Sequence, residues 1–195
     1  MKNIPQGRVQ FSSKHEEIGC CLRNFFVSAD NSDLLQTYKA MMTCVDLPAI
    51  NCSESFEFAF NRFFVGPLAP VAPPFASVYL DRDKLVMGPS TQDARDLYTA
   101  LGLNSPWAGS LPDDHVSLEI DGCLHLRQLS ERHDNPQLSA LYHSFLTEHF
   151  SQWIPKFCNR IMSANDAPLP LYAVAEALTE WLNNELINMP KGEFL

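Results

Sequence analysis

The sequence predicts a helical fold, and two observations support this. Apolar residues recur at the helical spacing i, i+3, i+4 in segment after segment, whereas a strand is plausible only over Ala76 to Leu80. With 195 residues, 46% hydrophobic and 19% charged, the chain is long enough for one sizeable core or two coupled halves. No internal repeat and no low-complexity segment interrupts the pattern.

Three helices are predicted in the first third of the chain. The first lies around residues 18–25 and the second over 34–42, with a cap among Asn31, Ser32 and Asp33 and with Pro48 after it. Ser53 is the predicted cap of the third. One face of that helix carries an aromatic stripe: Phe56, Phe60, Phe63 and Phe64.

The stripe runs into a proline-rich stretch, FNRFFVGPLAPVAPPFASVYLD, at residues 60–81. Proline fixes φ and has no amide proton, so residues 67–74 are predicted to be extended and irregular. The high apolar content argues against disorder. Two interpretations stay open: a rigid loop that shapes an apolar groove, or a lid over the core.

Beyond this loop, residues 81–83 are predicted to form a turn, and Ser90 is predicted to cap a helix that Gly102 ends. The following LNSPWAGSL is rich in turn-forming residues and marks a hinge. We therefore expect an N-terminal helical part at 1–104, a hinge at 105–111 and a C-terminal helical part at 112–195, which work as one unit.

The segment from Ser110 to His115 has the features of a helix start. Ser110 or a neighbour is the predicted cap, Pro112 falls in the first turn, and two aspartates oppose the positive end of the helix dipole. A histidine cation is disfavoured at that end. A pairing with Asp114 or with Glu119 could still hold the imidazole there. We expect His115 to orient Asp114 or the start of the helix, and not to act in catalysis.

A long helix is predicted from Asn135-Pro136 to Trp153, where Pro155 bends or ends it. A last helix is predicted after Pro168-Leu-Pro170.

Signatures of common chemistry are absent. The sequence has no phosphate-binding loop, no GxGxxG, no GxSxG elbow, no HExxH and no CxxC. Cys123 and His125 are spaced i, i+2 and would point to different faces of a helix, so no metal site is predicted. No cofactor is predicted either.

Charge and cysteine content limit the environment and the partners. A net charge of −9 makes nucleic acid and anionic membranes poor partners and favours a cationic one. The six cysteines show no disulfide framework, and neither an export signal nor a membrane span is predicted. We expect a cytoplasmic protein.

Two motifs resemble those of the TorD/DmsD/NarJ family of chaperones for molybdenum-containing reductases, nearest to the DmsD branch. Phe60-x-x-Phe63-Phe64 before the proline loop resembles the family's aromatic-x-x-Leu-Phe motif, and Pro112-x-Asp114-His115 resembles its Glu-Pro-x-Asp-His motif. The late HFSQWIPKF is also similar to a family pattern. The chain departs at Leu111, where the family typically has glutamate.

The resemblance implies an all-α fold and a cytoplasmic, non-enzymatic chaperone. Such a protein binds the twin-arginine signal peptide of a molybdenum-cofactor reductase, of the DMSO or TMAO reductase kind, and holds back its export until the cofactor is inserted. The implied signal-peptide contacts combine apolar and acidic residues: Phe60, Phe63, Phe64, Leu68, Pro74, Phe75, Ser77, Tyr79, Asp81, Pro112, Asp114, His115 and Glu119.

The apolar contacts are expected to supply most of the affinity. Burial of a large apolar side chain is worth about 1.5–3 kcal/mol, against roughly 0–1 kcal/mol for an exposed ion pair. Phe75→Ala or Tyr79→Ala is therefore predicted to weaken peptide binding more than Asp81→Asn, as measured by calorimetry.

Two other classes of function stay open. One is a helical hydrolase or nucleotide-binding protein that uses Asp114 and His115, and the other is a scaffold that binds the folded body of a reductase. The client stays open, as does the choice between a monomer and a domain-swapped dimer.

Overall fold

The computed structural model describes residues 13–103, 110–133 and 135–189. Within these ranges all the regular secondary structure is helical, which confirms the predicted fold class. Two π-helical segments are labelled η. The elements are α1 (Lys14–Phe26), α2 (Asn31–Met41), α3 (Ser53–Phe60), η1 (Asn61–Val65), α4 (Ser77–Leu80), α5 (Pro89–Ala100), α6 (Val116–Arg132), α7 (Pro136–Ser144), η2 (Phe145–Phe150), α8 (Ser151–Met162) and α9 (Leu169–Asn188).

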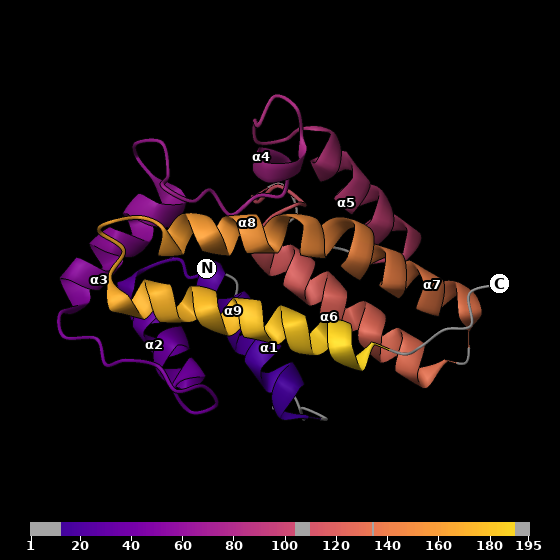
Figure 1. The fold of residues 1–195 in the computed structure, drawn as a ribbon, viewed down its shortest axis with the longest axis horizontal. Coiled ribbons are helices and arrows are strands. Elements are labelled where there is room, and N and C mark those ends of the chain that lie inside the picture. Colours follow the sequence, from indigo (N-terminus) through magenta and orange to yellow (C-terminus); the bar gives the residue numbers. More distant parts are fainter. Residues whose placement is uncertain (1–12, 104–109, 134, 190–195) are drawn as a thin grey trace.

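A long helical rod made of α7, η2 and α8 organises the molecule. It runs antiparallel to α9, while α1 packs against α6 and α2 (Figure 1). The segment α3–η1 lies at one end of the rod, and α4 and α5 lie along its other side. None of the helices in the described ranges is long and apolar enough to cross a membrane.

The core is rich in aromatic side chains. Trp153 of α8 and Trp181 of α9 are the largest fully buried residues. The predicted stripe on α3 and η1 is buried as well, and Phe64 contacts the rings of Phe26 and Phe157. This end of the aromatic segment is therefore core.

Several predicted helix starts are displaced by one residue or more. The cap of α2 is Asp30, whose carboxylate accepts from the Asp33 N–H at 2.9 Å. The cap of α3 is Cys52, without a side-chain hydrogen bond, so Ser53 is the first helical residue. The spacing of apolar residues did not identify the N-cap residue, because several adjacent residues have side chains that can cap a helix.

The start of α5 is capped from a distance. Gly88 is its N-cap residue, and the Asp81 carboxylate accepts from the Ser90 N–H at 3.2 Å. Ser90 is therefore inside the first turn, and the prediction that it caps the helix is wrong. Gly102, with φ +66°, follows the last turn as predicted.

Ala76 to Leu80, the one stretch where a strand was plausible, contains the short helix α4, Ser77–Leu80. The N–H groups of Ala76 and Ser77 both donate to Asp114, and this turns the chain into a helix. The local spacing of apolar residues and the composition could not predict this contact, because Asp114 lies 37 positions from Ser77 in the sequence.

The C-terminal predictions hold, and one alternative among them is resolved. Asn135 caps α7 by accepting from the Gln137 N–H at 2.9 Å, as expected. Pro155 lies inside α8, so of the two predicted alternatives, a bend or an end of the helix, the end is excluded. Residues 105–109 of the predicted hinge lie outside the described residues.

Candidate functional site

The proline loop and the start of α6 are joined by their backbones. The Ala76 N–H donates to the Asp114 carbonyl at 3.0 Å, and the Val116 N–H donates to the Pro74 carbonyl at 2.9 Å. Phe75 and His115 form an isolated antiparallel bridge between these bonds. The two predicted motifs therefore meet in space, and we call this contact the loop–helix junction.

Asp114 lies at the centre of the loop–helix junction and is fully buried. Its Oδ2 accepts from the Ser77 N–H at 2.8 Å, at the start of α4. Three neighbouring polar atoms, Asp114 Oδ1, Ser77 Oγ and Ser117 Oγ, have no hydrogen-bond partner in the described chain. The Asp114 carboxylate therefore stabilises the loop–helix junction and is not exposed to solvent.

His115 is the N-cap of α6, which begins at Val116 and not near Ser110 as predicted. Its Nδ1 accepts from the Ser117 N–H at 3.2 Å, and its ring lies 5.2 Å from that of Phe75. Burial lowers the pKa of His115 to about 3, so the imidazole is neutral and can accept at the positive end of a helix. His115 thus acts at the helix start, as one of the two expected roles has it, and its side chain hydrogen-bonds the Ser117 N–H and not Asp114 or Glu119.

Glu119 is fully buried and belongs to a different contact. It accepts from His149 Nε2 and from Trp153 Nε1, both at 2.7 Å. Burial raises the pKa of Glu119, while the two donors oppose that shift. Burial lowers the pKa of His149, but the carboxylates of Glu119, Asp93 and Asp114 together outweigh burial, so the pKa is raised. Glu119 thus ties α6 to the rod.

The remaining predicted contacts divide into buried and exposed residues. Phe60, Phe63, Phe64, Pro74 and Ser77 are buried, so a peptide on the surface would not touch them.

Phe75, Tyr79, Asp81 and Pro112 are half-buried. The ring of Tyr79 stacks on Trp153 at 5.7 Å.

Leu68 is the predicted contact that is most exposed, at 84%. It lines a pocket of about 510 Å³ together with Phe58, Asn61, Arg62, Gly66, Pro67, Ala69 and Val71. Phe58 is 71% exposed, and Val65, which precedes the lining residue Gly66 in the sequence, is 65% exposed. We call the exposed side chains of Phe58, Val65 and Leu68 the apolar rim.

Neither Phe58 nor Val65 was among the predicted signal-peptide contacts. Phe58 does not share the spacing of the buried stripe, so its position predicts a phenylalanine on the solvent face of α3. A large aromatic side chain on a polar face was the signal available in the sequence.

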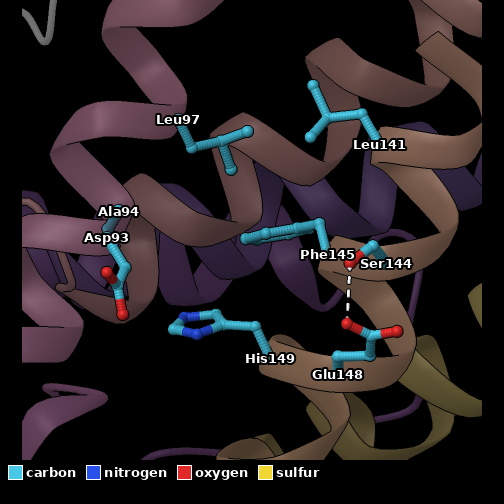
Figure 2. Close-up of a pocket in the computed structure, with 8 residues that line it drawn as sticks. All are labelled: Asp93, Ala94, Leu97, Leu141, Ser144, Phe145, Glu148 and His149. Atoms are coloured by element: carbon cyan, nitrogen blue, oxygen red, sulfur yellow. Dashed lines mark hydrogen bonds between the residues drawn. The ribbon is translucent and has the colours of Figure 1, made fainter. Parts of the chain in front are cut away.

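A second pocket, of about 290 Å³, lies between α5 and the rod (Figure 2). Its lining is apolar in the middle and acidic at the edges: Asp93, Ala94, Leu97, Leu141, Ser144, Phe145, Glu148 and His149. None of these residues was predicted as a contact.

The described residues contain no group of three or more metal-binding side chains. Cys123 is buried and His125 is exposed, in agreement with the opposite directions predicted for them.

Two curated relatives are similar to parts of the chain. The Tat proofreading chaperone DmsD of Salmonella typhi is 31% identical over 53% of this chain and 48% of its own length. The chaperone protein TorD of Aliivibrio salmonicida is 30% identical over 55% of this chain and 51% of its own. The chain thus spans about half the length of these relatives, both of which are named as chaperones and not as catalysts.

A solved structure supports the fold. A putative redox enzyme maturation protein from Archaeoglobus fulgidus superimposes with a TM-score of 0.62 at 17% identity, over 94% of this chain and 99% of that one. Residues 28–159 match the model of the family described as nitrate reductase delta subunit. Since that match covers more than half of the sequence, the chain belongs to this family, the TorD/DmsD/NarJ family that its motifs resemble.

Proposed function

We propose that this protein is a chaperone that binds the twin-arginine signal peptide of a molybdenum-cofactor reductase and delays export until the cofactor is inserted. Its action would take place in the cytoplasm, before export. The names of its curated relatives support a chaperone role. The observation that carries the signal-peptide part is the apolar rim around the pocket beside the proline loop.

The apolar rim matches the central part of such a peptide. A leader has an apolar segment, and the rim offers three large exposed apolar side chains beside a pocket of about 510 Å³. Each large apolar side chain that is buried on binding is worth about 1.5–3 kcal/mol before ordering costs. The rim is therefore the main source of affinity.

The rigidity of the loop helps binding. Gly66, with φ +129°, ends η1, and the N–H groups of Val71 and Ala72 donate to the carbonyls of Arg62 and Phe63 at 3.1 and 2.8 Å. A loop already held in place loses little conformational entropy when a peptide docks on it.

The predicted contacts then have two roles. Leu68, Phe75, Tyr79, Asp81 and Pro112 remain candidates for touching the peptide, because each has exposed surface. The buried members, such as Asp114 and His115, position the loop. The net charge of −9 attracts a basic leader over a distance.

No observation favours the hydrolase or nucleotide-binding alternative. Asp114 binds the start of α4 and His115 caps α6, so their side chains are occupied separately. A histidine with a pKa of about 3 is also a poor proton donor near neutral pH.

The proposal is tested by isothermal titration with synthetic twin-arginine leaders from reductases of the same genome. We expect saturable binding that is lost when the apolar segment is scrambled and reduced when Arg-Arg becomes Lys-Lys. Failure of every leader to bind would contradict the proposal and favour a scaffold for the folded reductase.

A further inference from the structure

The carboxylates that the sequence offers to a basic peptide are already in use. Asp81 accepts from Ser90, Asp114 accepts from Ser77, and Glu119 accepts from His149 and Trp153. Asp114 and Glu119 are buried, and Asp81 is only half-buried but already holds Ser90, so a cationic group that docks from solvent needs additional carboxylates.

The pocket between α5 and the rod supplies them. Figure 2 shows Asp93 of α5 on one side and Glu148 of η2 on the other, with the rings of Phe145 and His149 between them and Leu97 toward the top of the view. Both carboxylates are exposed. Ala94, Leu97, Leu141 and Phe145 give the pocket apolar walls. At about 290 Å³ the pocket is at the small end for ligand sites, so it suits a side chain.

The pocket keeps an excess of negative charge. Its lining includes no lysine or arginine, and His149, whose pKa Asp93 helps to raise, has its charge balanced by its partner, the buried Glu119 carboxylate. Arg95, also on α5, binds Asp113 at 2.7 Å. Asp93 makes no hydrogen bond to another described residue, and Glu148 accepts from the neutral Ser144 hydroxyl at 3.0 Å.

We propose that this pocket binds an arginine or lysine side chain from the basic segment of the client's leader. The inference rests on the proposed function. The aliphatic stem packs against Leu97, Leu141 and Phe145, and the cation lies between the carboxylates of Asp93 and Glu148. The pocket thus recognises the charge of the leader while the apolar rim recognises its apolar segment.

The test is calorimetry of the full chain with three leaders, which carry Arg-Arg, Lys-Lys or Gln-Gln. Wild type should bind the Arg-Arg leader about tenfold more tightly than the Gln-Gln leader. In the double variant Asp93→Asn, Glu148→Gln the preference should fall to near onefold, because the Arg-Arg leader loses affinity and the Gln-Gln leader does not. In wild type, the affinity for the Lys-Lys leader should lie between the affinities for the other two leaders.

Asp96→Asn is the matched control. Asp96 is exposed on the same helix and accepts from Gln92 at 2.7 Å, but it does not line the pocket. It should keep the preference for Arg-Arg. An unchanged preference in the double variant, or an equal loss in the control, would overturn the inference.

A second probe separates this inference from the proposed function. N-acetyl-arginine amide, titrated in NMR, should shift the methyl signals of Leu97 and Leu141 in wild type and not in the double variant. If leaders bind but the amide leaves these signals unchanged, the pocket is not the basic subsite. If the amide binds there and no leader does, the proposed function fails and the pocket stands.

Discussion

The loop–helix junction and the apolar rim both involve the proline-rich stretch, yet they differ in burial and in polarity. The junction is buried and polar, and Asp114 and His115 satisfy backbone N–H groups there. The rim is exposed and apolar, and Leu68 has no core contact to maintain. The motif residues Asp114 and His115 therefore support the loop, while the exposed residues of the apolar rim belong to neither motif.

The largest effect is expected on the buried side. Glu119→Ala leaves His149 and Trp153 without their acceptor, and breaking a buried charged contact costs about 3–5 kcal/mol. Chemical denaturation should show this loss in the free energy of unfolding. Glu131→Ala on the same helix, which removes an exposed i, i+4 pair with Arg127, is the control and should cost under about 0.5 kcal/mol. Equal costs for the two variants would contradict the comparison.

The next effect depends on pH and also belongs to the loop–helix junction. Because the pKa of His115 is about 3 when folded, the unfolded chain binds a proton below pH 6.5 that the folded chain does not. The contribution of the neutral His115 to the free energy of unfolding is fully present above pH 6.5 and is lost as the pH falls toward 3. At pH 5 the loss amounts to about 2 kcal/mol.

His115→Asn keeps an N-cap side chain and removes this titration. The free energy of unfolding of the variant should therefore fall less between pH 7 and pH 5 than that of wild type, by about 2 kcal/mol. Parallel pH profiles for the two proteins would show that His115 is not buried in a neutral form.

On the exposed side, Leu68→Ser should change binding without changing stability. Loss of one apolar contact of this size should weaken leader affinity about tenfold in calorimetry. The melting temperature should stay within about 1–2 °C of wild type, since exposed substitutions cost little. A large fall in melting temperature would place Leu68 with the supporting residues.

The smallest effect is expected at the exposed ion pair between Arg62 and Asp166, beside the apolar rim. Asp166→Asn should change the free energy of unfolding by less than about 1 kcal/mol, and less still at high salt. A loss similar to that of Glu119→Ala would break the division between the two regions.

The fold was largely predictable because helical spacing records which face of each helix is buried. The stripe on α3 and the start of α7 at Asn135 are examples. Errors arose where the cap comes from elsewhere in the chain, as when Asp81 caps α5 and Asp114 starts α4. No local pattern encodes such partners.

The candidate site was predictable only in part for a related reason. Motif resemblance located the proline loop and the segment at His115, and the structure brings them together. It could not tell exposed from buried members, because Leu68 and Phe64 are both apolar residues of one short stretch. The pocket at Asp93 and Glu148 joins helices far apart in the sequence, so it has no sequence signature.

The contact between Ser77 and Asp114 also sets an order of events during synthesis. These residues are separated by 37 positions, so the proline loop leaves the ribosome before the residues that hold it. At roughly 5–20 residues per second, the delay is about 2–7 s. During that time the nascent chain carries the apolar proline-rich segment without the residue that holds it, and the segment is then open to binding by a chaperone.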